Sequence, residues 1–370
     1  MELSPYLATM EEAGASDLFV TVGFPVSAKI NGQITHVGDE LLTEESALAL
    51  VHEAMSEKQI KEFEETKECN FAIAREGIGR FRCSAFWQRD MAGMVIRRIV
   101  TQIPQVSELG LPEVLKEVIM SKRGLILFVG GTGTGKSTSL AALIGYRNQN
   151  SRGHILTIED PIEFVHEHGG CVVTQREVGI DTRSFDDALK SSLRQAPDVI
   201  LIGEIRSMET MEYAMSFADT GHLCVATLHA NNANQAIERI MHLAPSDQHA
   251  KLRFDLSLNI RAIVAQQLVP TPDGKGRVAA IEILLNSPLV ADLIQRNEIG
   301  SLKEAMQKGK QMGMQSFDMA LYDLYKADTI TLDQAIHHAD SPNDLRLMIK
   351  LASDEGNTLG SLSNVSIDLD

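Results

Sequence analysis

The sequence lacks the features of a membrane-embedded or nucleic-acid-binding protein. No stretch approaches the roughly 18 consecutive apolar residues that a spanning helix needs. The 34 basic side chains are outnumbered by 50 acidic ones, for a formal charge of −16, which argues against a broad nucleic-acid footprint but leaves room for a local basic patch. The N-terminus is acidic and unlike a signal peptide. We therefore expect a cytoplasmic protein with no direct membrane insertion, which reaches a membrane only through a partner.

The chain also lacks any C-x-x-C pair. This spacing disfavours structural zinc, and without a secretory context disulfides are disfavoured too, so buried free thiols are expected. The four cysteines are Cys69, Cys83, Cys171 and Cys224.

The 370 residues, 44% of them hydrophobic, leave room for two domains with a core each. Residues 1–100 have the pattern of a small α/β domain. Leu18–Val22 is strand-like, residues 28–34 predict a hairpin around an Asn-Gly turn, and a helix is expected over Glu44–Met55. Paired strands then follow, the second over Arg80–Gln88. The sequence thus predicts an α/β unit before the first domain boundary.

Beyond a linker at residues 101–111, apolar runs alternate with helical stretches over residues 112–350. Short, nearly continuous apolar runs suit strands covered by helices on both faces, so this part predicts an α/β nucleotide-binding domain that ends in helices. Residues 351–370 are polar and lack basic side chains, which predicts a disordered acidic tail. The predicted strands are Leu125–Val129, Ile155–Ile158, Cys171–Thr174, Val199–Ile202 and Leu223–Thr227.

The most informative feature is the octet Gly130–Ser137, which fits the P-loop pattern G-x-x-x-x-G-K-[ST]. It lies between a predicted strand and a predicted helix, the setting in which backbone N–H groups converge on a phosphate. Lys136 would approach the β and γ phosphates of ATP, and Ser137 would offer its hydroxyl to Mg²⁺. The alternative is a glycine-rich turn that binds nothing. The residues expected to hold ATP here are Gly131, Thr132, Gly133, Thr134, Gly135, Lys136, Ser137 and Thr138.

Hydrolysis also needs an oriented water, a held metal ion and a group that offsets charge on the γ-phosphoryl. Glu163 follows a predicted strand that ends in a proline turn, at the sheet edge where α/β folds bind ligands. It is our candidate to activate the water, with a solvated acidic turn as the alternative. Glu204 comes at the end of the apolar run over residues 198–204, as a Walker B acid does, and would bind Mg²⁺ through water or help to hold the nucleophile. A purely structural Glu204 is the other interpretation.

Histidines stand at both ends of the predicted strand Leu223–Thr227. His222 and His229 could reach toward a γ-phosphate, and we count His222 among the nucleotide-binding candidates. A histidine at a strand end is usually only a hydrogen-bonded surface group, so this signal alone is weak. A metal site at His166 and His168 is weaker still.

Together these segments resemble the type IV pilus retraction ATPases (PilT/PilU), over about residues 10 to 350. The set of motifs is highly specific, although the P-loop alone would not be. Besides the P-loop, the matching segments are residues 15–23, Gly79–Arg82, Ile158–Phe164 (the family's Asp box), residues 193–206 and Thr220–His229 (its His box).

The resemblance implies a PAS-like N-terminal domain, a RecA-like ATPase domain and a ring of six subunits. It implies Glu163 as the catalytic glutamate, Glu204 as the Walker B acid and His229 as a γ-phosphate sensor. It also aligns Arg82 and Arg97 with family arginines that face the phosphates, a role that suits a guanidinium. Without the family, pairing with surface carboxylates would be the preferred interpretation of both arginines.

The sequence departs from the PilT pattern at a segment linked to retraction. Where PilT-type members carry Ala-Ile-Arg-Asn-Leu-Ile, this chain reads Leu289–Ile294 with Ala291 in place of the arginine and Asp292 beside it. The ending over residues 339–346 and the additional tail are closer to the PilU branch. We therefore expect an accessory retraction ATPase that works with a PilT-like ATPase and an inner-membrane platform protein at the pilus base.

Three other functions stay open. A regulatory subunit that binds ATP with little turnover would explain the missing arginine. An assembly-type ATPase is disfavoured because that branch usually carries a longer N-terminal region and a tetracysteine zinc element. A nucleic-acid motor of related fold is disfavoured by the charge of −16.

Overall fold

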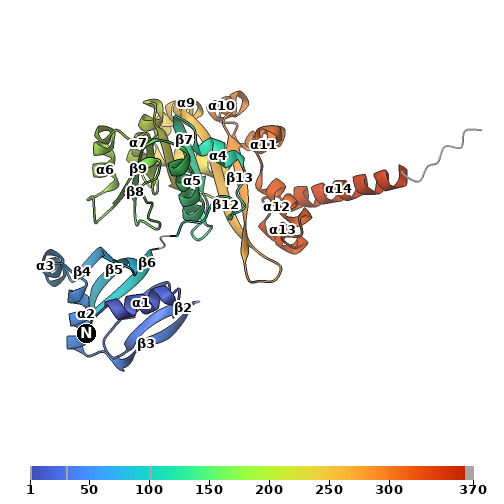
Figure 1. The fold of residues 1–370 in the computed structure, drawn as a ribbon. Coiled ribbons are helices and arrows are strands. Elements are labelled where there is room, and N and C mark those ends of the chain that lie inside the picture. The colour runs from blue at the N-terminus through green and yellow to red at the C-terminus, as the bar shows by residue number, and fades with distance from the viewer. Residues whose placement is uncertain (1, 31, 100–101, 363–370) are drawn as a thin grey trace, which may run out of the picture. The chain divides into compact units, whose positions relative to one another are not determined.

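The computed structural model describes residues 2–30, 32–99 and 102–362, shown in Figure 1. The chain separates into two compact units, each described here by itself. The N-terminal unit comprises residues 1–103 together with 159–167 and 175–188, and the C-terminal unit comprises residues 104–158, 168–174 and 189–370. The division between Ile103 and Pro104 falls inside the segment that the sequence predicts as a linker.

The N-terminal unit is built on a six-stranded sheet in the order β3-β2-β1-β6-β5-β4. The predicted hairpin forms, since Ile30 pairs with Gln33, while the first turn residue, Asn31, lies outside the described residues. The predicted helix begins at a capping box in which Thr43 Oγ1 accepts from Ser46 N at 3.2 Å. Fully buried aromatic side chains such as Phe81 form the core. The elements are α1 (Ser4–Glu12), β1 (Asp17–Val20), β2 (Pro25–Ile30), β3 (Gln33–Leu41), α2 (Glu44–Glu53), α3 (Glu57–Thr66), β4 (Glu68–Arg75), β5 (Gly79–Gln88) and β6 (Met91–Ile99).

The C-terminal unit is built on a seven-stranded sheet in the order β13-β12-β7-β11-β10-β8-β9. The pairs β12–β7, β7–β11, β11–β10 and β10–β8 are parallel, and β13 runs antiparallel to β12. The residues of β7 and β10 are buried throughout, as expected for strands covered on both faces. The strands are β7 (Gly124–Val129), β8 (Gly153–Glu159), β9 (Cys171–Glu177), β10 (Val199–Ile202), β11 (Leu223–Leu228), β12 (Ile260–Pro270) and β13 (Arg277–Leu285).

Helices follow or connect these strands, and the chain continues after β13 with helices alone apart from an isolated bridge at Gln315. Helix α14 includes residues 351–362, part of the segment predicted as a disordered tail, and residues 363–370 lie outside the described chain. The predicted α/β class with helices at the C-terminus is confirmed. The helices are α4 (Val114–Ile119), α5 (Lys136–Asn150), α6 (Phe185–Ser192), α7 (Met208–Asp219), α8 (Ala233–Leu243), α9 (His249–Asn259), α10 (Pro288–Gln295), α11 (Leu302–Lys308), α12 (Phe317–Lys326), α13 (Leu332–His338) and α14 (Pro342–Leu362).

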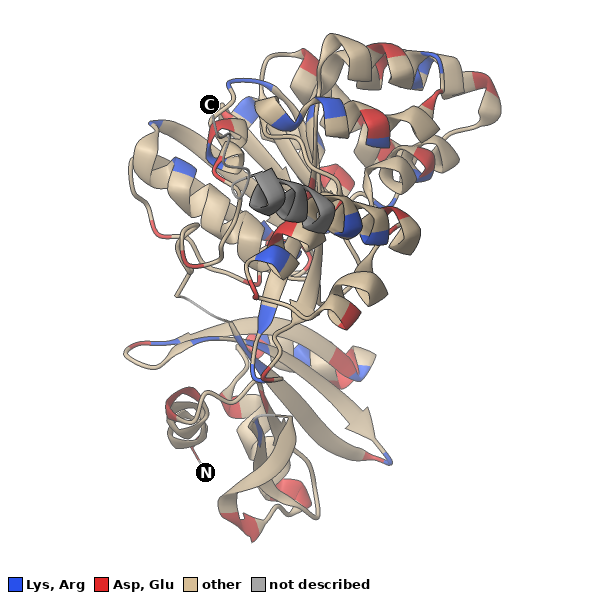
Figure 2. Cartoon of the chain, turned by 90° about the vertical axis from the view of Figure 1, so that its right-hand side faces the viewer, with Lys and Arg blue, Asp and Glu red and all other residues tan. Residues whose placement is uncertain are grey.

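Several expectations about composition can be checked in the described residues. All four cysteines are free and buried, as predicted. None of the described helices combines the length and apolarity that crossing a membrane requires. Lys and Arg positions are interspersed with Asp and Glu positions along helices and loops of both units (Figure 2).

Candidate ATP-binding and catalytic site

The P-loop connects β7 to α5, as the sequence predicts. The last residue of β7 is Val129, and α5 begins at Lys136 after the N-cap Gly135, whose φ is +85° and which makes no side-chain capping hydrogen bond. The first N–H groups of a helix have no partner within the helix, and the positive end of the helix dipole lies there. This end of α5 therefore suits an anionic phosphate group.

Close packing explains why two of the loop positions are glycine. A Cβ on Gly130 would lie 2.6 Å from Thr134 Oγ1 and 2.7 Å from the carbonyl oxygen of Gln266. A Cβ on Gly135 would lie 2.8 Å from Gln266 Nε2. Gln266, a buried residue of β12, thus packs closely against the loop at Gly130 and Gly135. The sequence analysis missed it, although an amide within an apolar strand was a usable signal.

The Lys136 ammonium lies over the loop. Its Nζ donates to the carbonyl oxygens of Gly130 at 2.8 Å and Gly131 at 2.7 Å. Thr134 Oγ1 also donates to the Gly131 carbonyl, at 2.9 Å. A bound phosphate would accept from this ammonium in place of the two loop carbonyls. The geometry of the loop therefore fits a triphosphate.

Glu204 and His229 meet at the carboxyl edge of the sheet. His229 Nε2 lies 3.2 Å from Glu204 Oε1, and Arg206 Nε lies 2.7 Å from the other carboxylate oxygen, Oε2. The Glu204 side chain is 17% exposed, against 49% for His229. The carboxylate of Glu204, the predicted Walker B acid, is thus placed between a cation and an imidazole. Arg206 lies within the segment that carries the family resemblance, but the sequence analysis gave it no role.

The parallel pairing of β7, β11, β10 and β8 brings their carboxyl ends to one edge. The P-loop leaves β7 there, His229 follows β11, and Glu204 follows β10 by two residues. This is the edge at which open α/β sheets bind ligands. The phosphate cradle, the Walker B candidate and the sensor candidate therefore share one edge of one sheet.

His222 lies at the opposite edge of this sheet from the P-loop, and its role in nucleotide binding stays a prediction. It precedes β11, and its carbonyl accepts from the N–H of Gly124, the first residue of β7. Its Nδ1 lies 3.1 Å from Thr220 Oγ1. The six residues of β11 separate it from His229, roughly 20 Å at the rise of a strand. The sequence placed the two histidines at the two strand ends but could not show which end faces the P-loop.

The N-terminal unit gathers the remaining candidates around one pocket of about 400 Å³. Arg82 and Arg97 are direct cross-strand partners on β5 and β6. Glu163 is exposed, and the Ile162 N–H beside it donates to Glu177 Oε2 at 3.2 Å. The pocket is lined by Arg82, Arg97, Arg98, Ile99, Pro161, Ile162, Glu163 and Phe164.

Glu177 is a residue of this region that the sequence analysis missed. Its side chain is 1% exposed and lies 3.7 Å from Arg82 Nε. Burial is the largest cause of change in the pKa of the Glu177 carboxyl, and it raises this pKa. Glu177 thus contacts both the backbone of Ile162, next to Glu163, and the guanidinium of Arg82. These contacts connect the loop of Glu163 to β5.

The comparisons agree with this geometry. The family model described as "Type II/IV secretion system protein" matches residues 3–331. The chain belongs to this family. It is 60% identical to the type IV pilus ATPase PilU of Pseudomonas aeruginosa, over 98% of this chain and 95% of that protein. It is 40% identical to the type IV pilus retractation ATPase PilT of the same organism, over 93% of this chain and 100% of that one.

Solved structures give the same result. The pilus retraction motor PilT with bound ADP superimposes with a TM-score of 0.87 at 39% identity, covering 94% of this chain and 99% of that chain. The ATPase DotB of Legionella pneumophila superimposes with a TM-score of 0.76 at 26% identity, over 93% and 94% of the two chains. The predicted membership in the PilT/PilU family is confirmed, and with it a nucleotide-binding ATPase related to pilus retraction.

Helix α10 of this secretion-family ATPase carries the departure from the PilT pattern. Ala291 stands where the arginine is expected, and Asp292 is 46% exposed and paired with Arg296 at 3.0 Å. The pairing is of the i,i+4 type, which contributes little to stability. Helix α10 therefore lacks a cation at position 291, and the charge of Asp292 beside it is balanced by Arg296.

The alternative of a metal at His166 gains no support. Over the described residues, no group of three or more His, Cys, Asp or Glu side chains is arranged to hold a metal ion. Burial lowers the pKa of His166 to about 4, so this imidazole is neutral near pH 7. Its backbone N–H donates to Gln175 Oε1 at 2.7 Å.

Proposed function

We propose that this protein is an ATP-hydrolysing motor subunit of the type IV pilus machinery that assists pilus retraction in the manner of PilU. The observation that carries the proposal is the shared sheet edge of the P-loop and the Glu204–His229 contact at 3.2 Å. A phosphate cradle alone binds nucleotide, whereas hydrolysis also needs groups that hold the metal ion and orient the attacking water. A carboxylate at the same sheet edge is suited to such a task.

The phosphates of ATP are held by the N–H groups at the start of α5 and by Lys136. Ser137 and, through water, Glu204 would bind Mg²⁺, and their hydroxyl and carboxylate oxygens suit this hard cation. When bound, the ion offsets charge on the phosphates. Glu204 is kept in place by Arg206 and His229.

The remaining steps of hydrolysis are assigned to four further side chains. We assign Glu163 the task of orienting and deprotonating the attacking water, for which an exposed carboxylate on a loop anchored by Glu177 is suited. Arg82 and Arg97 stabilise the charge that develops on the phosphoryl oxygens. His229 senses the γ-phosphate, because its imidazole can exchange its contact with Glu204 for a phosphoryl oxygen.

The subunits form a ring of six in the cytoplasm, at the inner-membrane base of the pilus. Their partners are a PilT-like retraction ATPase and a platform protein in the membrane, and the charge of −16 disfavours nucleic acid as a partner. Loss of the γ-phosphate frees the groups that it holds, and this release drives the conformational step.

Steady-state hydrolysis by the purified chain tests the proposal. Lys136→Ala should abolish nucleotide binding or turnover. Glu163→Gln should keep nucleotide binding and lower kcat by at least about 100-fold, since a general base typically contributes 10² to 10⁴. Wild-type turnover in Glu163→Gln would refute the assignment of Glu163. In cells, deleting this gene while the PilT paralogue is present should weaken pilus withdrawal.

The alanine at position 291 favours one second candidate function. If retraction needs the PilT-type arginine, a chain with Ala291 at that position acts as an ATP-binding regulatory subunit of the PilT motor. Turnover by the isolated protein no higher than that of Lys136→Ala would favour this candidate over the motor.

A further inference from the structure

The segment that follows His229 is anchored at the start of α8. Three residues separate His229 from α8, and the last of them, Asn232, caps the helix by accepting from the N–H of Gln235 at 2.9 Å. In addition, the side-chain Oε1 of Gln235 accepts from the N–H of Asn231 at 3.2 Å. The position of His229 therefore depends on where the N-terminus of α8 is held.

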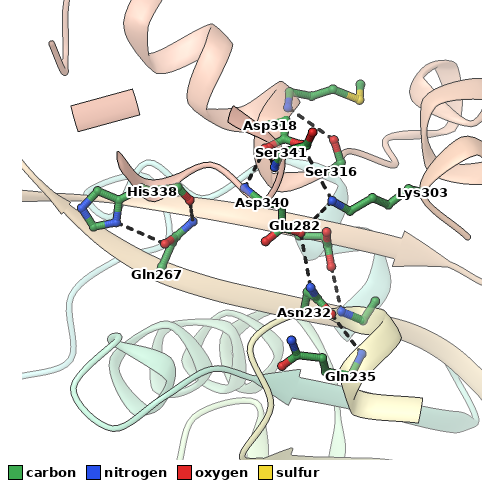
Figure 3. A network of polar contacts seen from close by, with 12 residues as sticks. Asn232, Gln235, Gln267, Glu282, Lys303, Ser316, Asp318, His338, Asp340 and Ser341 are labelled. Carbon is green, nitrogen blue, oxygen red and sulfur yellow. Dashed lines mark hydrogen bonds and ion pairs between the residues drawn. The ribbon is translucent and has the colours of Figure 1, made fainter. Parts of the chain in front are cut away.

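Glu282 of β13 holds that N-terminus. Its Oε1 accepts from the N–H of Ala233, the first residue of α8, at 2.7 Å (Figure 3). The Glu282 side chain is almost fully buried, at 1% exposure, and burial raises its pKa to about 7. Burying a carboxyl is costly unless it is hydrogen-bonded. The bond from the Ala233 N–H therefore stabilises Glu282 in its buried position.

Asp340 ties the same point to the C-terminal helices. Its Oδ2 accepts from Asn232 Nδ2 at 3.3 Å and lies 3.0 Å from Lys303 Nζ on α11. Asp318 of α12 completes the network, because its Oδ1 accepts from the N–H groups of Asp340 at 2.9 Å and Ser341 at 3.2 Å. The turn between α13 and α14 is thus fixed to the start of α8 (Figure 3).

We propose that Glu282 and the Asp340–Lys303 pair are positioning groups for His229, through which the C-terminal helices influence γ-phosphate sensing. The inference rests on the proposed sensor role of His229. A shift of α13 or α14 would move Asp340, and with it Asn232 and the segment that carries His229. A partner that binds these helices would then alter hydrolysis without touching ATP.

Two matched lysines of α11 test the coupling in the full-length protein. Lys303 lies in the network, whereas Lys308 makes an exposed i,i+4 pair with Glu304 at 2.7 Å. Lys303→Gln should lower kcat for ATP hydrolysis about tenfold with KM within about twofold, because small misplacements of catalytic groups are costly. Lys308→Gln should leave both constants unchanged. Equal kcat in the two variants would overturn the proposal.

A second pair of variants separates positioning from a general loss of structure. Glu282→Gln keeps an oxygen that can accept from the Ala233 N–H, and Glu282→Leu does not, so the glutamine variant should retain several-fold more activity. In a His229→Ala background the difference between them should vanish, since effects that act through one residue are not additive.

Persistence of the full difference without His229 would make Glu282 merely structural and would overturn the proposal. Should His229→Ala alone leave kcat at the wild-type value, the sensor role itself would be wrong. That failure is distinguishable from a result in which His229→Ala is impaired but Lys303→Gln is not.

Discussion

Arg82 and Arg97 lie directly opposite each other on β5 and β6. Directly opposed like charges on adjacent strands destabilise a sheet by some tenths of a kcal/mol. Each guanidinium is partly offset by a different carboxylate, Arg82 by Glu177 at 3.7 Å and Arg97 by Asp17 at 2.9 Å. A pair of cations retained at such a position, beside the loop of Glu163, is suited to an anion with several oxygens.

Replacing Arg97 should therefore impair hydrolysis more than it weakens the fold. Its side chain is 70% exposed, but that of its partner Asp17 is only 9% exposed, so its loss leaves a buried carboxylate that keeps the hydroxyl of Ser16 as a donor. We expect Arg97→Gln to lower kcat at least about tenfold and to lower the free energy of unfolding by only about 1 to 2 kcal/mol, so that the variant stays folded. Arg75→Gln is the matched control, because Arg75 lies on β4 and pairs with Glu53. Equal turnover in these two variants would contradict the role of Arg97.

The two histidines that flank β11 should behave differently. His229 contacts Glu204, so His229→Ala should lower kcat at least about tenfold while nucleotide still binds. His222→Ala should leave the affinity for ATP within about twofold, because His222 lies at the other edge of the sheet. A fluorescent ATP analogue and a phosphate-release assay measure both quantities. Loss of nucleotide affinity in His222→Ala would show that this histidine reaches a nucleotide site, in its own subunit or in another.

The parts of the site that were predictable depend on local pattern. A strand, a glycine loop and a helix follow each other in the chain, so Lys136 and Ser137 could be placed from the sequence. In the same way, the apolar run before Glu204 indicated that this residue lies at the end of a strand. Gln266 and Glu177 were missed because their roles arise from contacts between segments far apart in the chain. The edge of the sheet at which His222 lies was not predictable for the same reason, since strand direction within a sheet is set by topology.

The pH dependence of the N-terminal unit should reflect His166. Burial lowers the pKa of this imidazole from 6.5 to about 4, so the unfolded chain binds its proton first as the pH falls. The stability that His166 contributes is complete above pH 6.5 and is lost toward pH 4, by up to about 3 kcal/mol. Trp87, the one tryptophan of the sequence, lies in this unit and stacks on Phe63. Denaturant unfolding followed by its fluorescence should show a smaller pH dependence in His166→Phe, and an unchanged dependence would contradict the assignment.

Glu282 should give the C-terminal unit a pH dependence of the opposite sign. Its pKa is raised from 4.5 to about 7, mainly by burial, with Asp340 raising it further and Lys303 opposing the rise. The unfolded chain therefore releases this proton first as the pH rises. The stability that protonated Glu282 contributes is complete below pH 4.5 and is lost as the pH rises through 7, by about 3 kcal/mol.

Glu282→Gln removes this titration and keeps a hydrogen-bond acceptor for the Ala233 N–H. Relative to the wild type, the variant should gain about 2 to 3 kcal/mol between pH 5 and pH 8. The free energy of opening of the C-terminal unit is measured by hydrogen exchange at the slowest amides of β13. This measurement is independent of Trp87, which lies in the N-terminal unit. Asp273→Asn is the control, because Asp273 is exposed in the turn between β12 and β13. If Glu282→Gln and the wild type lost protection in parallel over this range, the buried carboxyl would already be ionised at pH 5, and the proton assigned to it would not exist.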